Sequence, residues 1–312
     1  MTLTELKYIV AVARERHFGR AAEACFVSQP TLSVAIKKLE EELDVKIFER
    51  GANEVSVTPL GEQIVRQAQQ VLEQANAIRE IAKSGKDPVS GPLKLGIIYT
   101  IGPYLLPDLV REAIARVPQM PLMLQENFTS KLLEMLRTGE LDCAIMAEPF
   151  PDTGLAVAPL YDEPFVAAVP VGHPLAARER ISAEELKQET MLLLGTGHCF
   201  RDHVLEVCPE YARFASPNSV GSEGIRKSFE GSSLETIKYM VASGMGVTVV
   251  PQLSLPKDVH PQDHVRYIPF APPPPTRRVV LAWRRSFPRY EAIAALRNCI
   301  YACPLPGVQR LT

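Results

Sequence analysis

Residues 60–84 constrain the fold of this chain more than any other stretch of its sequence. Apolar residues recur there at intervals of four, three, four, three and four, which places them on one narrow stripe of an α-helix. Such a stripe is the seam of a coiled coil, and its simplest partner is the same segment of a second copy. We therefore expect residues 60–86 to form a linker helix. Its dimerising side chains are expected to be Ile64, Ala68, Val71, Ala75 and Ile78, with Ala82 continuing the stripe.

Residues 1–59 have the pattern of a winged helix-turn-helix domain. Apolar residues at helical spacing predict helices over residues 3–15 and 27–43, and a short helix begins at Phe18 between them. Ser28 suits the N-cap of the last of these helices, and Pro30 suits its first turn. Residues 46–58 then have the pattern of a hairpin with a turn at residues 51–53, which would form the wing.

The helix over residues 27–43 opens with short polar side chains, as does a helix that enters the major groove of DNA. The candidate DNA contacts are Ser28, Gln29, Pro30, Thr31, Ser33, Lys37 and, on the wing, Arg50. The alternative is an ordinary three-helix domain with a solvated polar face, and the near balance of acidic and basic residues over positions 1–90 supports it. Because the formal net charge of the chain is −2, DNA binding would have to come from a local patch.

Residues 87–312 alternate between short apolar runs and helical patterns, after a linker with glycine and proline at residues 85–92. Buried strands are expected at residues 93–98, 122–126, 143–147, 165–169, 191–194, 246–250 and 279–283. This order predicts an α/β fold with a doubly wound parallel sheet covered on both faces. We expect lobe I to comprise residues 91–161 and 268–303, and lobe II to comprise residues 162–267.

Two cysteines, Cys199 and Cys208, bracket the eight residues FRDHVLEV. If this segment is helical, its nine steps of about 1.5 Å separate the two Cα atoms by about 13 Å. A disulfide requires Cα atoms about 4.4–6.8 Å apart, so the helix and the disulfide exclude each other. The segment therefore has the geometry of a two-state thiol switch.

Three other interpretations of these cysteines stay open at this stage. A metal site could combine Cys199 with His203, His198 and Cys208, although no paired-cysteine spacing supports it. A cysteine hydrolase would use Cys199 with a histidine base, but adjacent residues rarely face each other. A buried, inert thiol is the usual state of a lone cysteine in a core. The inert state is also expected for the remaining cysteines, which are Cys25, Cys143, Cys299 and Cys303.

Thr100 and Thr129 follow predicted strands, at the edge of the sheet where folds of this kind bind ligands. Their ordinary role would be helix capping or turn formation. A hydroxyl group can nevertheless both donate and accept hydrogen bonds, as a small polar ligand requires.

No apolar run reaches the length of a membrane span, and the N-terminal residues do not have the pattern of a signal peptide. We therefore expect a cytoplasmic protein that does not bind membranes. Its six cysteines are too few for a disulfide scaffold. In the cytosol a functional disulfide is expected to be transient.

Long motifs make the chain similar to a known family. The DNA-binding domain of LysR-type transcriptional regulators resembles two segments of this chain, HFGRAAEACFVSQPTLSVAIKKLEEELDVKIFER and the VTPLGEQIV that follows it. The hydrogen-peroxide sensors of that family resemble this chain in SGPLKLGIIYTIGPYLLP, GELDCAIMA, GHCFRD, Cys208 and SSLETIKYMVASGMGVTVVP. The resemblance implies a winged helix-turn-helix, a dimerising linker helix and a two-lobed regulatory domain of the periplasmic-binding-protein type. It also implies a homotetramer that rearranges on DNA when it is oxidised.

The same resemblance implies roles for single residues. Hydrogen peroxide would oxidise Cys199 to a sulfenic acid, and Cys208 would condense with it to a reversible disulfide. The peroxide-binding residues that it implies are Thr100, Thr129, His198, Asp202 and Arg278. Expected partners are double-stranded DNA with paired half-sites and RNA polymerase, with no cofactor, no metal and no enzymatic turnover. Two alternatives stay open, namely a LysR-type regulator that answers to a small-molecule effector and a thiol peroxidase.

Overall fold

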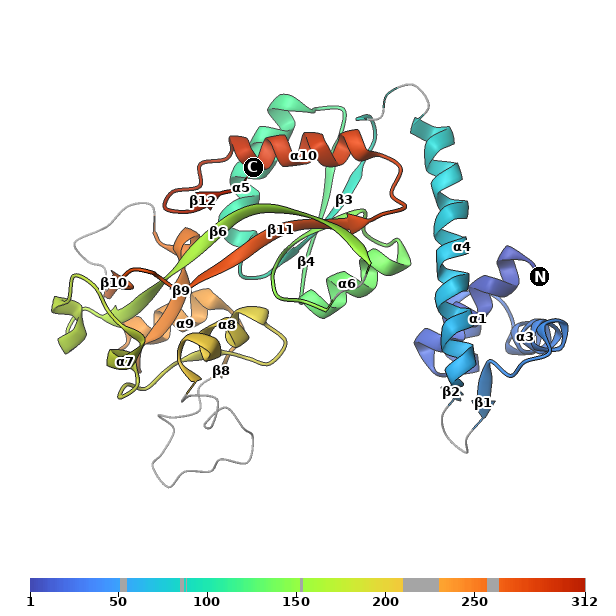
Figure 1. Ribbon diagram of the computed structural model, residues 1–312, viewed down its shortest axis with the longest axis horizontal. Helices are drawn as coiled ribbons and strands as arrows, with labels where there is room; N and C mark the ends of the chain where they lie inside the picture. The colour runs from blue at the N-terminus through green and yellow to red at the C-terminus, as the bar shows by residue number, and fades with distance from the viewer. Residues whose placement is uncertain are drawn as a thin grey trace. The chain divides into compact units, whose positions relative to one another are not determined.

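The computed structural model describes residues 1–50, 55–84, 87, 89–151, 154–209, 230–256 and 264–311. Contacts divide the chain into two compact units, of which the first consists mainly of Met1–Lys86 and the second mainly of residues from Asp87 onward. Figure 1 shows the helices of the first unit and the large sheet of the second. The turn expected at residues 51–53 lies outside the described residues, as do positions 85, 86 and 88 of the expected linker.

The first unit is a winged helix-turn-helix followed by a long helix, which confirms this part of the predicted fold. Its elements are α1 (Leu3–Glu15), α2 (Phe18–Ala24), α3 (Gln29–Leu43), β1 (Phe48–Arg50), β2 (Val55–Val57) and α4 (Pro59–Ser84). β1 and β2 pair as an antiparallel hairpin. The core lies between the helices and contains Ile9 and Val12 of α1 together with Leu32 and Leu39 of α3.

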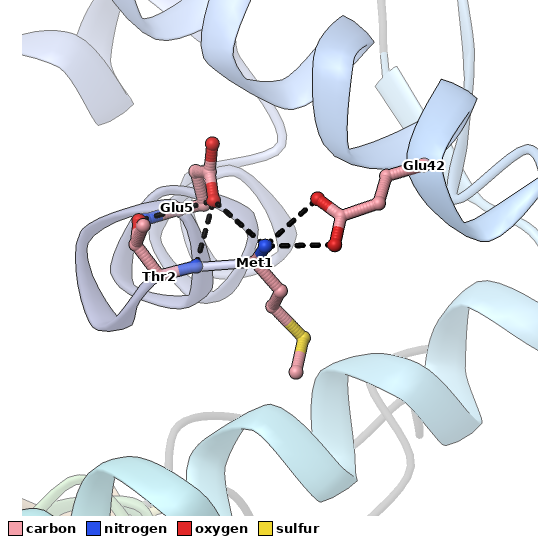
Figure 2. A network of polar contacts seen from close by, with 4 residues as sticks. All are labelled: Met1, Thr2, Glu5 and Glu42. Atoms are coloured by element: carbon pink, nitrogen blue, oxygen red, sulfur yellow. Dashed lines mark hydrogen bonds and ion pairs between the residues drawn. The ribbon is translucent and has the colours of Figure 1, made fainter.

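A polar network fixes the start of α1 (Figure 2). Thr2 is the N-cap, because its Oγ1 accepts a hydrogen bond from the backbone N–H of Glu5 at 3.2 Å. The Glu5 carboxylate accepts in return from the backbone N–H of Thr2 at 2.7 Å, which completes a capping box. The amino group of Met1 lies 2.8 Å from both carboxylate oxygens of Glu42, so α1 is tied to the end of α3.

The position of the wing relative to α3 is set by one half-buried carboxylate. Ser28 caps α3 by accepting from the backbone N–H of Thr31 at 3.3 Å. Three turns later, Glu40 accepts from the backbone N–H groups of Ile47 and Phe48, at 2.7 and 3.1 Å. The hairpin therefore leaves α3 in a fixed direction.

α4 uses part of its apolar stripe inside its own unit. Ala68 is only 3% exposed and packs with α1 in the core of the first unit, where Ile64 also makes contact. The exposed part of the stripe begins at Val71 and includes Ile78, which is 69% exposed. The expectation that Ala68 faces a second copy is therefore corrected, because periodicity does not distinguish a partner from the chain's own core. The side chain of Ala82 lies outside the described residues.

The second unit is built on an eight-stranded sheet with the path β10-β6-β11-β5-β3-β4, to which β9 and β12 add beside β6. Its strands are β3 (Leu93–Ile98), β4 (Leu122–Asn127), β5 (Cys143–Ala147), β6 (Leu155–Pro170), β9 (Thr248–Pro251), β10 (Val265–Pro269), β11 (Thr276–Arg284) and β12 (Gln309–Arg310). β3 pairs in parallel with β4 and β5, whereas β6 and β11 run antiparallel to each other. A separate small sheet pairs β7 (Leu193–Leu194) with β8 (Glu230–Gly231).

β6 connects the two lobes. Its first part pairs with β11 in lobe I, and its last part pairs with β9 and β10 in lobe II. The apolar run expected as a separate strand at residues 165–169 is the end of this 16-residue strand. The strand expected at residues 279–283 lies within β11, which pairs with β5 and so returns the chain to lobe I as predicted.

Helices cover both faces of the lobe I sheet, as predicted. The expectation of a parallel sheet is corrected, because the sheet is mixed: β6 and β11 pair antiparallel with all of their neighbours. In lobe I the helices are α5 (Gly102–Arg116), α6 (Thr129–Thr138) and α10 (Tyr290–Ala302). α5 and α10 pack against each other and lie above the sheet in the view of Figure 1, with α6 below it. Lobe II carries η1 (Pro174–Ala177), α7 (Ala183–Leu186), α8 (Cys199–Val207), α9 (Leu234–Ala242) and η4 (Gln252–Ser254). Within the described residues, no helix combines the length and the apolar character that a bilayer crossing needs.

Candidate functional site

Cys199 is the first residue of α8, and the residues before it form a tight turn. Gly197 has a φ of +100°, a backbone conformation that side chains with a Cβ rarely adopt. A Cβ on Gly197 would also lie 3.3 Å from the ring of Phe128. His198 follows as the N-cap without using its side chain for capping. Cys199 therefore sits at a helix N-terminus, where the backbone N–H groups stabilise negative charge.

A small cavity lies beside Cys199, between the end of β3, the start of α6 and the start of α8. It leaves about 10 Å³ for the centre of a water-sized molecule, which is room for one very small ligand. Its walls are Ile98, Tyr99, Thr100, Asn127, Phe128, Thr129, Gly197, His198 and Cys199. The structure thus brings four of the predicted site residues together, namely Thr100, Thr129, His198 and Cys199.

The two threonines offer different hydrogen-bonding groups to this cavity. The Oγ1 atom of Thr129 is buried and has no hydrogen-bond partner within the described part of the chain. The Oγ1 atom of Thr100 accepts from Nη1 of Arg277 at 2.8 Å. Since that bond occupies a lone pair of Thr100, the hydroxyl proton remains available for another acceptor.

Arg277 is a site residue that the sequence did not single out. Its guanidinium group is almost fully buried and donates to Glu163 at 2.8 Å and to the backbone carbonyl of Thr100 at 3.0 Å. The same group lies over the ring of Phe200 in α8, 5.1 Å from the ring centroid. Arg277 therefore connects Thr100 of lobe I with β6 and with the helix that carries Cys199.

The structure does not bring Arg278 or Asp202 to the cavity. Successive residues of β11 point to opposite faces of the sheet, so Arg278 faces away from Thr100. Its side chain is 48% exposed and pairs with Asp162 at 2.9 and 3.0 Å. Asp202 lies on the exposed side of the first turn of α8. Alternation along β11 was the signal that could have pointed to Arg277, but it leaves open which of two adjacent arginines faces inward.

His198 forms one wall of the cavity within a group of aromatic rings. Its ring centroid lies 4.9 Å from that of Phe128 and 5.8 Å from that of Tyr99. Burial lowers the pKa of His198, and a hydrogen bond to the backbone of Ser232 opposes this shift. The imidazole is therefore neutral at pH 7, so one ring nitrogen can donate and the other can accept.

Cys208 lies outside the cavity, in the core of lobe II. It is 0% exposed and belongs to the same apolar cluster as Phe200 and Val204 of α8. Its backbone N–H donates to the carbonyl of Val204 at 2.9 Å, at the end of the helix. The helix expected between the two cysteines is thus confirmed, and a rise of about 1.5 Å per residue keeps their Cα atoms about 13 Å apart. Neither cysteine forms a disulfide in this structure.

The rest of α8 is anchored to both lobes. Nη1 of Arg201 donates to the carbonyl of Leu194 in lobe II at 2.6 Å. Nε2 of His203 lies 2.8 Å from the carbonyl oxygen of Glu148, just after β5 of lobe I. Within the described residues, no group of three or more potential metal ligands comes together. Of the residues in the metal hypothesis, Cys208 lies in the apolar core of lobe II at the end of α8.

The remaining cysteines have environments that disfavour a thiolate. Cys143, Cys299 and Cys303 are buried, and Cys25 is half-buried at the end of α2. Burial raises the pKa of all four thiols.

In the first unit, the candidate DNA contacts gather at the start of α3. Ser28, Gln29, Pro30, Thr31 and Lys37 are exposed, whereas Ser33 is half-buried. The hydroxyl groups of Ser28 and Thr31 lie 2.8 Å apart, and the exposed Lys37 pairs weakly with Glu41 at 3.7 Å. Arg50 is the last residue of β1, and its side chain lies outside the described residues.

A winged helix-turn-helix, a long helix and a two-lobed α/β unit with a thiol beside an inter-lobe cavity define the class of a two-domain bacterial regulator. The family comparison agrees with this architecture. Residues 3–62 match the family of bacterial regulatory helix-turn-helix proteins of the lysR type, and residues 86–302 match the LysR substrate binding domain. The chain belongs to the LysR family.

Similar proteins of this family share most of the chain. The hydrogen peroxide-inducible genes activator of Pectobacterium carotovorum subsp. carotovorum is 39% identical over 297 residues, which cover 94% of this chain and 95% of that protein. The DNA-binding transcriptional dual regulator OxyR of Escherichia coli K12 is 39% identical over 297 residues, 94% of each chain. These similarities confirm the resemblance seen in the sequence.

Two solved structures extend the similarity to the fold. Full-length OxyR C199D from Pseudomonas aeruginosa has a TM-score of 0.73 and 51% identity, and the match covers 97% of this chain and 95% of that one. A reduced form of OxyR from N. meningitidis has a TM-score of 0.66 and 41% identity, covering 72% of this chain and all of that one (100%).

Proposed function

We propose that this chain is a DNA-binding transcriptional regulator that responds to hydrogen peroxide, with Cys199 as the oxidised thiol. The observation that carries the proposal is the cavity beside Cys199. It has room for one very small molecule and offers a buried Thr129 hydroxyl that has no partner among the described residues. A peroxide molecule can fill this space and bond to both threonine hydroxyls. A larger metabolite does not fit this cavity. The cavity therefore does not support the alternative of a LysR-type regulator that answers to a small-molecule effector.

The reaction follows from the positions of the donors. The Cys199 thiolate attacks one peroxide oxygen, the O–O bond breaks, and the departing oxygen takes a proton to leave as water. Hydrogen bonds from Thr100 and Thr129 stabilise the negative charge that develops on that oxygen. Cys199 then carries a sulfenic acid.

The second step uses Cys208 as the resolving thiol. Its sulfur attacks the sulfur of the Cys199 sulfenic acid, a second water leaves, and a disulfide forms. In the reduced chain, α8 holds the two Cα atoms about 13 Å apart, well beyond the reach of a disulfide, so the helix has to unwind first. This change in lobe II is the conformational signal.

The DNA-binding and assembly parts of the proposal rest on the first unit. Double-stranded DNA with paired half-sites is contacted by the start of α3 and by the wing. The exposed part of the α4 stripe, including Val71 and Ile78, supports a dimer, and the regulatory units complete a homotetramer. RNA polymerase is the further partner, antioxidant genes are the targets, and the protein acts in the cytoplasm.

The test is to treat the full chain with one equivalent of hydrogen peroxide and to map thiols and disulfides by mass spectrometry, beside DNA footprinting. A Cys199 to Cys208 disulfide and a changed footprint are expected in the wild type and absent in Cys199→Ser and Cys208→Ser. Cys25→Ser is the matched control and should behave as wild type. Two free thiols at positions 199 and 208 after treatment would contradict the proposal, and continuous peroxide consumption with a reductant would point to a thiol peroxidase.

A further inference from the structure

The side chain of His203 on α8 reaches across to lobe I by a hydrogen bond. It lies in the middle of the helix, four residues after Cys199 and five before Cys208. The ring is only 4% exposed, and its Nε2 atom lies 2.8 Å from the carbonyl oxygen of Glu148. Because the bond spans 55 residues of sequence, it joins the switch helix to the end of β5.

The surroundings of the ring fix its protonation state. A carbonyl oxygen can only accept a hydrogen bond, so Nε2 must carry the proton. Nδ1 is buried and has no partner within the described part of the chain. A second proton on Nδ1 would therefore place a donor and a positive charge in the core with no acceptor.

The groups around His203 favour the neutral ring on balance. The rings of Phe165 on β6 and Phe200 on α8 pack against it, with centroids 6.1 and 6.3 Å away. Burial lowers the pKa of His203, and the positive charge of Arg277 on β11 lowers it further, while the bond to Glu148 raises it. Glu206 and Asp202, on the same helix, also raise the pKa by a smaller amount. The charge of Arg277 is itself paired with Glu163 on β6.

We propose that His203 is a positioning residue of the thiol switch, which holds α8 helical through Glu148 and makes the redox equilibrium depend on proton concentration. The proposal rests on the proposed function, since it requires that α8 unwinds when Cys199 and Cys208 form a disulfide. Unwinding breaks the bond to Glu148 and exposes the ring to water. His203 is then free to take a proton that it cannot hold in the reduced form.

The direction of the effect follows from the proton balance. Reduction of the disulfide normally consumes two electrons and two protons and yields two thiols. Below about pH 6.5, the ordinary pKa of an exposed histidine, the ring in the oxidised form already carries one extra proton. Reduction then releases that proton, so the net uptake falls from two protons to one. At low pH the disulfide form is therefore more populated than it would be if only the two thiols took up protons.

The matched variant is His203→Gln, because its amide N–H can still donate to Glu148 but the side chain does not titrate. The full-length wild type and the variant are equilibrated in the same dithiol buffers between pH 5 and 7.5, and the disulfide fraction is measured by thiol alkylation. The two should agree near pH 7.5. Below pH 6.5 the equilibrium constant of the wild type should move toward the disulfide, relative to the variant, by up to tenfold per pH unit. His198 titrates in both proteins and cancels in the comparison.

His203→Ala gives a second measurement that does not depend on titration. Loss of the bond to Glu148 should shift the equilibrium toward the disulfide even at pH 7.5, by about tenfold if the bond contributes a typical hydrogen-bond increment. Curves for wild type and His203→Gln that coincide at every pH would overturn the proposal. If no disulfide between Cys199 and Cys208 forms at any pH in either protein, the proposed function itself fails instead.

Discussion

Replacing Arg277 by glutamine should destabilise the second unit much more than the same change at Arg278. Arg277 is buried with Glu163, each side chain being 1% exposed, and it also donates to Thr100. The substitution leaves the Glu163 carboxylate in the core, where it still accepts a hydrogen bond from the backbone N–H of Leu253 at 2.8 Å but has lost its cation. Breaking a buried ion pair from one side costs about 3–5 kcal/mol. For a unit of this size, that corresponds to a fall in Tm of roughly 6–20 °C.

Arg278→Gln is the control, because it removes an arginine from the adjacent position. The Arg278 side chain faces water and Asp162, so the Tm of this variant should stay close to the wild-type value. Thermal and urea unfolding of the three proteins, followed by circular dichroism, measure the difference. Adding Glu163→Gln to the Arg277 variant should recover part of the loss, since no charge is then left buried without its partner.

The same pair of variants tests whether Arg277 or Arg278 supports peroxide binding. Arg277→Gln frees the Thr100 hydroxyl from its fixed orientation, so the second-order rate of Cys199 oxidation should fall about tenfold, the value of one typical hydrogen bond. Arg278→Gln should react at the wild-type rate. Stopped-flow measurements of the two oxidation rates are made at a temperature below the thermal unfolding midpoint of the less stable variant. Equal losses of stability at the two positions, or a rate that falls only in Arg278→Gln, would refute the reasoning.

Three further perturbations test other parts of the structure. Thr129→Val removes a buried hydroxyl without a described partner, so thermal unfolding should show equal or higher stability while the stopped-flow rate with peroxide falls about tenfold. Lys37→Gln should weaken DNA binding alike for all sequences and reduce the slope of log K against log salt by about one, which titrations at several salt concentrations measure. Burial lowers the folded-state pKa of His198, so the unfolded chain takes up its proton first, and the free energy of unfolding should fall as pH drops below about 6.5. His198→Asn should reduce this fall in urea titrations at pH 7 and pH 5, and an unchanged fall would contradict the argument.

Local signals in the sequence were sufficient to predict α3, whereas the helical state of α8 was an assumption of the two-state interpretation. Ser28 and Pro30 mark the start of α3, while it is the structure that shows α8 to run from Cys199 to Val207. Local pattern placed Thr100 and Thr129 after strands, while their role in a binding site, like that of His198, was implied by the family resemblance. These features depend on residues within a few positions of one another.

The features that sequence reasoning missed depend on distant partners. Alternation along β11 shows that Arg277 and Arg278 face opposite ways, but only Glu163 and Thr100 decide which one is inside, and they lie 114 and 177 residues away. In the same way, the periodicity of α4 identifies an apolar stripe but not the neighbour that covers Ala68. The position of His203 against Glu148 is a third case, because no local pattern links the two.

The burial of Cys208 has a consequence for timing. In the proposed reaction the sulfenic acid on Cys199 forms beside a cavity, whereas Cys208, the proposed resolving thiol, lies inside the core of lobe II with Phe200 and Val204. The lifetime of the sulfenic acid would then be governed by how often α8 opens, and closing the ten-residue loop afterwards costs about 2.7 kcal/mol of chain entropy. A second peroxide that arrives within this interval oxidises Cys199 irreversibly. The packing around Cys208 thus decides how long an exposure must last to be registered, and how large a dose destroys the sensor.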